Sequence, residues 1–380
     1  MGKKRYRHLV YKALMIAFAL VVIEGSVRIA AFAGLCNIRT FETKDQLEEI
    51  TFLGDVNPHF GAWHLTNATV VVKNPRGQVS YASNSFGMRD RARVEATTAP
   101  ERAVVLGDSF VEGSHVDAAD RVTDVLEKDT GVEFLNFGTA GHFGSIQEWM
   151  LYKHLAIRFD HTLVCLFLLP DNDFTDNDPA QHSPDRYRPY LREVDGSYEV
   201  TYPIPFAAPT ARQSKLSSGR KFRHRMYNSW YSLNLIAHRD VSEFVDPFRR
   251  RIIKSSYDTY TPTDLARLLF TYQQIVALAN KRPVYIFIIP RDKDFMAHKA
   301  GRFEGRIATA LTAFAKETPG LDVVDLMPHF LAYAEEHDVS YKRFFLAFDP
   351  HWSPLGHRVA ADAVLDALQS HDIKGPRTTL

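Results

Sequence analysis

The chain has few of the residues that cross-link a fold or give it a strong charge. It contains two cysteines, Cys36 and Cys165, among 380 residues, and its 46 basic and 45 acidic side chains leave a formal net charge of +1. Two cysteines are too few for a disulfide scaffold, and their spacing offers no metal knuckle. A protein that grips the phosphates of nucleic acid usually has a clear basic excess. We therefore expect no nucleic-acid partner.

Signatures of cofactor and metal sites are also missing. The sequence contains no GxGxxG, no GxxxxGK[ST] and no HExxH. These motifs cradle phosphates or hold zinc, so we predict neither a cofactor nor a bound metal. At 45% hydrophobic residues, the chain has enough apolar side chains to bury one large core.

The N-terminus joins a basic head, MGKKRYRH, to an apolar segment from Leu9 to Leu35. The uninterrupted apolar part, Ala13–Ile23, would suit a signal peptide that is later cleaved. The whole segment reaches across a bilayer if Lys12 and Arg28 extend toward the interfaces. We favour an uncleaved membrane anchor over residues 9–35, while cleavage stays an open alternative. The basic head then stays in the cytoplasm and the remaining chain lies outside it, in the periplasm.

Apolar strands and helical patterns alternate beyond residue 100. The pattern predicts strands over 103–106, 133–136, 162–169, 283–289 and 321–325, and helices over 121–129, 145–157, 263–280, 302–316 and 356–368. This alternation is typical of a parallel sheet covered on both faces. We predict an α/β fold, a three-layer α/β/α sandwich with a mostly parallel sheet, preceded by a transmembrane helix.

We divide the chain into an anchor (1–35), a loop-rich lead-in (36–100) and a main domain (101–372) that is interrupted by an insertion over about 178–262. The lead-in contains a short strand-like piece, Thr69–Val72. The insertion carries a basic cluster without an intervening acid: Arg212, Lys215, Arg220, Lys221, Arg223 and Arg225. This cluster could contact anionic glycan or lipid headgroups, but charge runs are more often solvated loops.

Two glycine-bearing motifs follow predicted strands. In AVVLGDSFVEG, Gly107 permits a tight turn that presents Ser109 at the start of a helix, where a nucleophile would be exposed. Asp108 could equally be only a helix cap. In EFLNFGTAGHFG, a loop with Gly141 could point a backbone N–H at a reacting carbonyl, or simply connect a strand to a helix.

Two further motifs supply an amide and an acid–base pair. Asn172 in CLFLLPDNDF follows a strand and could donate to an oxyanion, or could form a turn. Asp349 and His351 flank Pro350 before the final helix, so the carboxylate could orient the imidazole as a general base. Such a pair could also be structural or bind a metal.

Two neighbours of this pair have simpler interpretations. We assign packing to Trp352 and a structural or surface role to His357. After the strand at 283–289, Arg291 and Asp292 could border the site or form a surface turn.

The first three motifs follow predicted strands directly, so their polar residues should reach one edge of the sheet. Together the four motifs resemble blocks I, II, III and V of the SGNH (GDSL-like) hydrolase superfamily. Three further features resemble its membrane-anchored bacterial members: SNSFGMRD (83–90), RYRPYLREVDG (186–196) and the pair Glu24 and Arg28. Two positions depart from the pattern, since Pro170 replaces a glycine and the last block is D-x-H-W instead of D-x-x-H.

The resemblance implies that Ser109 is the nucleophile, His351 the general base and Asp349 its orienter. It also implies an oxyanion hole made of the Ser109 and Gly141 N–H groups and the Asn172 amide. The expected function is a serine esterase or acyl hydrolase that acts on ester bonds of an acylated extracytoplasmic carbohydrate or lipid. The D-x-H-W spacing also occurs in relatives that handle exopolysaccharide acetylation, which leaves acyl transfer open.

Three alternatives remain at this point. The first is an O-acyltransferase for a cell-surface polysaccharide. The second is a non-catalytic glycan-binding subunit that retains the fold. The third is a metal-dependent hydrolase whose ligands would be Asp108, Asp173, Asp349 and His351, a sparse set for such a site.

Overall fold

A computed structural model describes residues 3–32, 38, 52–74, 77–180, 186–207, 218–238, 254–347 and 349–369. By internal contacts the chain forms two compact units. The first comprises Met1–Glu48 and Ala211–Ile252, and the second comprises Glu49–Thr210 and Ile253–Leu380. The predicted insertion is thus shared between them, because only its middle part falls in the first unit.

The second unit is built on a five-stranded parallel sheet in the order β11-β10-β7-β5-β6. Its strands are β5 (Arg102–Gly107), β6 (Glu133–Gly138), β7 (Leu163–Leu168), β10 (Val284–Ile288) and β11 (Leu321–Asp325). Counted along the chain from β6, this order is 2-1-3-4-5, the flavodoxin-like arrangement. Nearly every side chain of the three central strands, β5, β7 and β10, is buried, as expected for a sheet covered on both faces.

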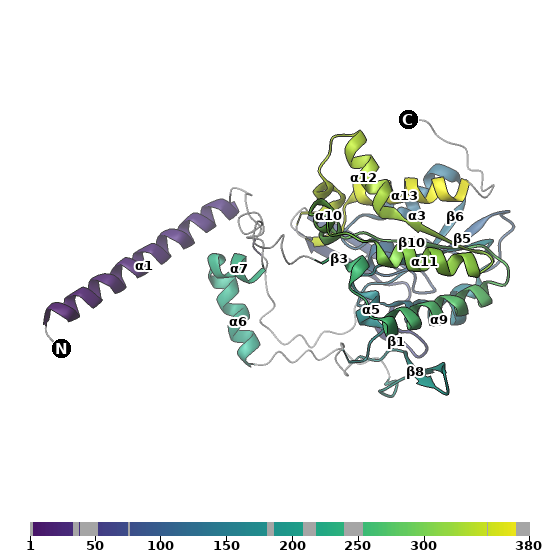
Figure 1. Cartoon of the computed structure of the whole chain (residues 1–380), viewed down its shortest axis with the longest axis horizontal. Helices are drawn as coiled ribbons and strands as arrows, with labels where there is room; N and C mark the ends of the chain where they lie inside the picture. Colours follow the sequence, from purple (N-terminus) through teal and green to yellow (C-terminus); the bar gives the residue numbers. More distant parts are fainter. Residues whose placement is uncertain are drawn as a thin grey trace. The chain divides into compact units, whose positions relative to one another are not determined.

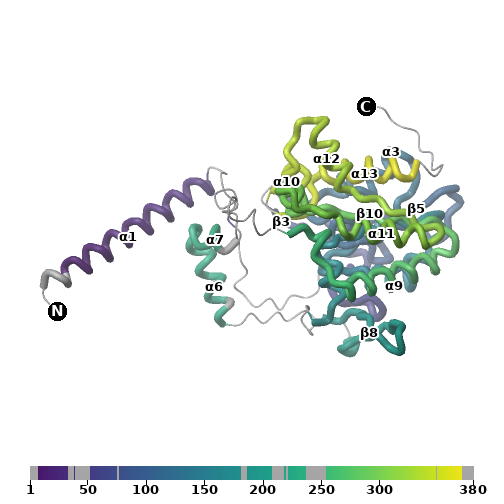
Figure 2. The backbone as a smooth tube through the Cα atoms, viewed as in Figure 1, coloured from purple at the N-terminus to yellow at the C-terminus, as the bar shows by residue number. Residues whose placement is uncertain are grey.

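Helices cover the two faces of this sheet in separate layers (Figure 1; Figure 2). One layer holds α3 (Val122–Thr130), α12 (Leu326–Glu336) and α13 (Pro354–Gln369). The opposite layer holds α4 (Ser145–His154), α9 (Pro262–Ala279) and α11 (Arg306–Glu317). The predicted three-layer α/β/α fold is confirmed.

Local sequence signals explain where several helices begin and end. In α9, Thr261 caps the helix and accepts a hydrogen bond from the Asp264 N–H, while Pro262 occupies the first turn. The helix ends at Asn280, which adopts the left-handed conformation. These signals stand in the sequence, and the predicted helix over 263–280 agrees with them.

The helix predicted over 302–316 begins later than the periodicity indicates. Gly305 has a positive φ of 66°, and α11 starts at Arg306. The reason lies outside the local pattern, because the Asp258 carboxylate accepts the backbone N–H groups of Glu304 and Arg306 and holds the segment before the helix. A separate short helix, α10 (Asp292–Lys299), precedes it.

The lead-in is more ordered than the expected loop. It forms two antiparallel hairpins, β1 (Leu53–Asn57) with β2 (Gly61–His64), and β3 (Thr69–Asn74) with β4 (Gly77–Ala82). The predicted strand piece at 69–72 is therefore confirmed as part of β3.

Short elements complete the second unit. The hairpin of β8 (Tyr190–Val194) and β9 (Ser197–Thr201) lies in the inserted region, and β12 (Phe345–Leu346) pairs with β13 (Asp349–Trp352) before α13. Single helical turns follow two strands as α2 (Ser109–Glu112) and α5 (Asp173–Asp176). The remaining single turns are the 3-10 helices η1 (Ala118–Asp120), η2 (Ala156–Arg158), η3 (Ser256–Asp258) and η4 (Tyr341–Phe344).

The first unit contains three helices among its described residues: α1 (Lys3–Phe32), α6 (Ser218–Ser229) and α7 (Tyr231–His238). The segment Arg7–Phe32 of α1 is long and apolar enough to span a membrane. Cys36, Arg212 and Lys215, which the sequence analysis singled out, lie outside the described residues.

Candidate active site

The nucleophile candidate lies on the turn between β5 and α2. Gly107 ends the strand, and a Cβ there would lie 2.4 Å from the Val111 Cγ2 atom, so only glycine fits without movement. Asp108 caps α2 by accepting the Phe110 N–H at 2.9 Å. The helix-cap interpretation of Asp108 is therefore confirmed, and this cap fixes the short helix that begins with Ser109.

The structure brings Ser109, His351 and Asp349 together. His351 Nε2 lies 2.7 Å from Ser109 Oγ, while His351 Nδ1 bonds to Asp349 Oδ1. Asp349 Oδ1 also accepts the His351 backbone N–H at 3.0 Å. The His351 and Asp349 side chains are 21% and 25% exposed, so a solute can reach the group. This is the relative placement of nucleophile, base and orienting acid in serine hydrolases.

The charge of Asp349 is favoured by its neighbour. Burial alone would raise the pKa of Asp349, but the hydrogen bonds and the positive charge of His351 outweigh burial and lower it. An ionised Asp349 fixes the Nδ1–H tautomer of His351, which leaves Nε2 facing the hydroxyl as a proton acceptor.

Asn172 lies beside this group, at the end of β7. Its Nδ2 donates to Asp108 Oδ2 at 3.1 Å. An amide nitrogen carries two N–H donors, so this bond uses one of them. β5 and β7 flank the point where the strand order reverses, which is where open α/β sheets bind ligands.

Gly141 lies in the loop after β6 with a positive φ of 87°. Its carbonyl oxygen accepts a hydrogen bond from Arg186, whose other Nη donates to Asp55 at 2.8 Å. A Cβ added at Gly141 would lie 3.2 Å from Leu53 Cδ2 and 3.5 Å from Arg186 Nη2. The predicted oxyanion role of its N–H stays a prediction.

The two other residues considered in the last motif are both deep in the core. Trp352 is fully buried and meets the Phe110 ring edge to face at 5.1 Å, in agreement with a packing role. His357 is buried as well, and its Nδ1 accepts the Val122 N–H at the start of α3. Burial, followed by the nearby charges of Arg121 and Arg89, lowers the pKa of His357 to about 3. His357 is therefore structural and does not lie on the surface.

The acidic residues of the metal-dependent alternative have separate tasks. Asp173 accepts the Leu169 N–H at 2.9 Å and is fully buried. Burial and the charge of nearby Glu148 raise the pKa of Asp173 well above its usual value, so it is held neutral. In the ranges that the structure describes, no three His, Cys, Asp or Glu side chains are grouped so that they could hold a metal ion.

Cys165 lies in the apolar run LVCLFLL, and this setting predicts an inert core residue. It is buried in β7 with a free thiol, and burial raises the pKa of that thiol. A thiol in such surroundings is neither nucleophilic nor a metal ligand, in agreement with the prediction.

The residues that support α2 from the lead-in were not predicted from the sequence. His64 bridges the Gly87 carbonyl oxygen (2.8 Å, from Nδ1) and the Glu112 carboxylate (2.9 Å, from Nε2), all of them buried. Arg89 donates to the carbonyl oxygens of Glu112 and Val116 at 2.8 and 2.9 Å. Arg89 was noticed only as part of the SNSFGMRD resemblance. The signal in the sequence was an arginine that lies between turns containing glycine, where a buried guanidinium can donate hydrogen bonds to several backbone carbonyl groups.

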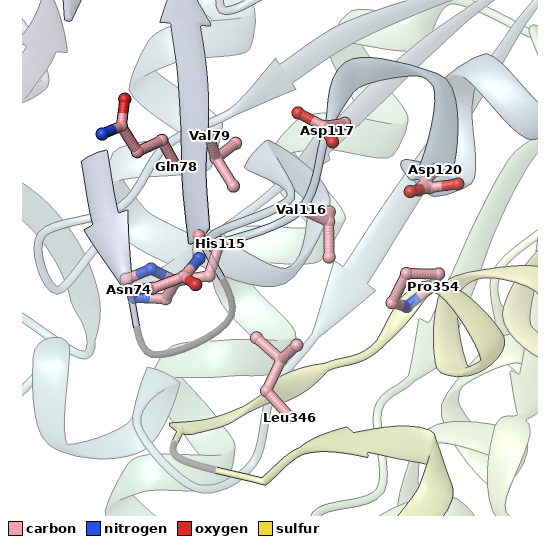
Figure 3. Close-up of a pocket in the computed structure, with 10 residues that line it drawn as sticks. Asn74, Gln78, Val79, His115, Val116, Asp117, Asp120, Leu346 and Pro354 are labelled. Carbon is pink, nitrogen blue, oxygen red and sulfur yellow. The ribbon is translucent and has the colours of Figure 1, made fainter. Parts of the chain in front are cut away.

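A cavity of about 150 Å³ lies between the β3–β4 hairpin and the segments that carry His115, Leu346 and Pro354 (Figure 3). His115, with a positive φ of 65°, lines it, and its Nε2 is 3.7 Å from Asp349 Oδ2. Burial, ahead of the charges around it, lowers the pKa of His115. The β3–β4 hairpin forms one wall and Leu346 and Pro354 contribute to another. The lead-in therefore shapes the surroundings of the catalytic candidates.

Arg291 borders the site, as one of the two sequence interpretations expected. Its guanidinium lies 5.7 Å from the Phe110 ring centre and pairs with Asp171 at 2.7 Å. Lys293 also pairs with Asp171. Asp292 contacts its neighbour Arg291. Its Oδ1 atom lies 4.0 Å from Arg291 Nε, at the distance limit of an ion pair.

No family model matches the chain, and no curated protein matches it. Solved structures do match. One is described as a member of the lipolytic protein G-D-S-L family from Veillonella parvula; the match has 13% identity and a TM-score of 0.38, and it covers 71% of this chain and 98% of the other.

Two further matching structures are described by the activity of their protein. An acetylxylan esterase from Geobacillus stearothermophilus matches at 13% identity and a TM-score of 0.37, over 74% of this chain and 98% of its own. A salicylyl-acyltransferase from a tetracycline biosynthetic pathway matches at 12% identity and a TM-score of 0.38, over 73% and 58%. At these identities and TM-scores, the matches carry no conclusion about the activity of this chain.

Proposed function

We propose that this chain is a serine ester hydrolase in which Ser109, His351 and Asp349 form the catalytic triad. The observation that carries the proposal is the continuous hydrogen-bonded series from Ser109 Oγ through both His351 nitrogens to the Asp349 carboxylate. These residues come from two distant parts of the chain, 242 positions apart for Ser109 and His351. Such a series in a partly exposed position is what nucleophilic catalysis by serine requires.

The proposed reaction passes through an acyl-serine. His351 Nε2 takes the Ser109 proton while Oγ bonds to the ester carbonyl carbon, and the carbonyl oxygen becomes an oxyanion. When the oxyanion collapses, the bond to the alcohol breaks and His351 gives its proton to the leaving oxygen. Water then repeats the sequence on the acyl-serine, releasing the acid and restoring the Ser109 hydroxyl.

The oxyanion is held in this proposal by the Ser109 and Gly141 N–H groups and by the second N–H of Asn172. The bond from Asn172 to Asp108 supports this role, because it fixes the amide beside the nucleophile turn before substrate arrives. The guanidinium of Arg186 on the Gly141 carbonyl does the same for the loop after β6. Preorganised donors of this type are worth roughly 10²- to 10³-fold each in turnover.

We further propose that the substrate is an acylated carbohydrate or lipid outside the cytoplasm and that α1 anchors the enzyme in the membrane. The length and apolar character of Arg7–Phe32 support the anchor. Hydrolysis is the default outcome for an acyl-serine that water can reach. An alcohol in place of water would give acyl transfer, which the D-x-H-W spacing keeps as the alternative.

The test uses the purified full-length chain in detergent. We expect hydrolysis of an aryl acetate and labelling by a fluorophosphonate, with mass spectrometry locating the adduct on Ser109. Ser109→Ala should lose the label and several orders of magnitude in rate, since only binding and oxyanion assistance remain. Ser197→Ala, at an exposed hairpin position, is the matched control and should behave as the unchanged chain.

Full activity or full labelling of Ser109→Ala would overturn the assignment. If neither version of the chain reacts, a non-catalytic glycan-binding role takes its place. Product analysis with added alcohol acceptors separates the two enzymatic outcomes, because hydrolysis releases free acid and transfer yields a new ester.

A further inference from the structure

Two charged residues of the helix α1, Glu24 and Arg28, form hydrogen bonds with the inserted helices of the first unit. The Glu24 carboxylate accepts the backbone N–H groups of Tyr231 (2.9 Å) and Ser232 (3.0 Å) and the Ser232 hydroxyl (2.8 Å). Arg28 donates to Glu24 at 2.8 Å and to the Ser229 carbonyl at 2.7 Å. The pair therefore holds the junction where α6 ends and α7 begins.

This junction explains why an apolar helix retains a carboxylate and a guanidinium. Charged groups at membrane depth are costly unless they are paired and hydrogen-bonded. The start of α7 offers Glu24 two backbone donors, and the Tyr231 ring lies 4.5 Å from the Arg28 guanidinium. The contacts tie α6 and α7 to the segment of the chain that is apolar enough to enter a bilayer.

One side of α6 is apolar and exposed. Phe222, Met226 and Trp230 follow one another at a spacing of four residues, and their side chains are 65%, 37% and 42% exposed. The Trp230 N–H bonds to the Met226 carbonyl, so the helical turn continues through all three. On a helix this spacing forms a single stripe.

Exposed arginines flank this stripe on both sides. Viewed down the helix axis, Arg223 lies beside Trp230 at one edge of the stripe, and Arg225 lies beyond Phe222 at the other edge. Both arginines are exposed. The sequence from Ser218 to His238 contains no acidic residue. An apolar stripe with an aromatic residue and basic flanks is the pattern of helices that lie in the membrane interface.

We propose that α6 is a membrane-surface helix that binds anionic phospholipid. Phe222, Met226 and Trp230 enter the interfacial region of the bilayer that α1 crosses, and Arg223 and Arg225 contact anionic headgroups. The inference rests on the proposed membrane insertion of α1 and is independent of the catalytic triad. A soluble anionic glycan would satisfy the arginines but would leave the apolar stripe without a partner.

Tryptophan fluorescence offers a direct test, because Trp230 is the exposed member of the chain's four tryptophans. Trp63, Trp149 and Trp352 are 4%, 8% and 0% exposed. The full-length chain is reconstituted into vesicles of phosphatidylcholine and phosphatidylglycerol that carry bromine near the headgroup end of the acyl chains. We expect bromine to quench part of the emission, and we expect Trp230→Phe to remove that quenched part.

The lipid charge is tested with the double variant Arg223→Gln/Arg225→Gln. Each arginine near an anionic surface is worth roughly a fivefold change in local affinity, so quenching in phosphatidylglycerol vesicles should fall toward the value in phosphatidylcholine alone. Arg192→Gln, which neutralises an exposed arginine of the β8–β9 hairpin, is the control and should quench as the unchanged chain does. Glu24→Ala, which removes the acceptor at the junction, should also reduce quenching.

Flotation of the vesicles separates the two ways of failing. If the protein floats with the vesicles but bromine quenches it and Trp230→Phe equally, α1 is inserted and the proposal for α6 is overturned. If the protein does not float, the anchor itself is overturned and α6 with it. Quenching that is indifferent to phosphatidylglycerol but abolished by a soluble polyanionic glycan would also overturn the proposal, because it would identify a glycan as the partner.

Discussion

His351 and His357 stand close together in the sequence, but their surroundings give them different chemistry. His351 is partly exposed and hydrogen-bonded to the Asp349 carboxylate, whereas His357 is buried and accepts the Val122 N–H through Nδ1. A buried imidazole that accepts a hydrogen bond is held neutral, because a proton on Nδ1 would remove the acceptor and place a charge in the core. Proximity in the sequence therefore says little about which histidine can serve as a base.

Because His357 is neutral in the folded chain, we predict that the free energy of unfolding decreases as the pH is lowered. The pKa of His357 is about 3 in the folded chain, whereas the ordinary pKa of histidine is 6.5, so below pH 6.5 the unfolded state binds the extra proton. Folding is then disfavoured progressively as the pH falls, by about 2 kcal/mol between pH 7 and pH 5. His357→Asn keeps an acceptor oxygen but does not titrate. Urea unfolding should show it less stable than the unchanged chain at pH 7, with the difference shrinking by about that amount at pH 5.

Two comparisons make this pH prediction specific to His357. Ser197→Ala, at an exposed position without a titrating side chain, should show the same difference from the unchanged chain at both pH values. Buried carboxyls with raised pKa values, such as Glu148, shift the absolute stability in the opposite direction, so the difference between variants is the quantity to measure. A difference for His357→Asn that is constant between pH 7 and pH 5 would contradict the prediction.

At the level of elements, the nucleophile turn depends on close contact between α2 and β6. A Cβ on Gly138 would lie 2.2 Å from the Glu112 backbone nitrogen, which belongs to α2. Backbone cannot yield as the end of a flexible side chain can, so Gly138→Ala should push α2 away from the sheet. We expect a loss of roughly 1–3 kcal/mol in unfolding free energy, the usual cost of overpacking, and a lower esterase rate because Ser109 moves with α2.

Gly219→Ala is the matched control for that substitution. Gly219 lies in α6 with no atom within 4 Å of its added Cβ, and alanine is the better helix former. Its unfolding midpoint and its esterase rate should therefore not fall. An unfolding midpoint for Gly138→Ala equal to that of the unchanged chain would show that α2 does not need the close approach.

The elements that could be predicted are those whose signal is local. β5 and β7 were recognised because strands buried on both faces read as continuous apolar runs. The helix α12 was missed because it follows β11 without a loop, and Asp325 is both the last strand residue and the cap that accepts the Met327 N–H. No turn residue marks that boundary in the sequence.

The residues of the site also differ in whether a local sequence signal could predict them. Ser109 and Asn172 follow predicted strands, so the sheet rule was enough to suggest that they meet. His64 and Arg89 reach α2 from the lead-in, across 48 and 23 positions to Glu112. Periodicity carries no information about such distant partners. For the same reason, the sequence could not predict that the β3–β4 hairpin lines the cavity. Ser109, His351 and Asp349, which the structure brings together, could be picked out from the sequence, whereas the residues that support them could not.

At the scale of the whole molecule, the proposed anchor raises the question of on which side of a membrane the second unit lies. Four basic residues stand at 3–7, before an apolar helix segment, Arg7–Phe32, whose most apolar window has none of its surface buried within the protein. Basic residues beside a membrane helix are retained in the cytoplasm, so the second unit should be exported. Alkaline phosphatase fused after Leu380 should be active in a bacterial host, and a fluorescent protein fused at the same place should be dark.

The basic head itself is the variable that decides this orientation. Replacing the four basic residues at 3, 4, 5 and 7 with glutamine removes the bias, so phosphatase activity should fall and cytoplasmic fluorescence should appear. Arg192→Gln together with Lys316→Gln, distant from α1 in the sequence, should leave both reporters unchanged, because only charges close to the span in the sequence set its orientation. Membranes washed with carbonate should retain the fused chain if α1 is uncleaved. Bright fluorescence in the unchanged fusion would contradict the proposed orientation, and release by carbonate would instead identify α1 as a cleaved signal.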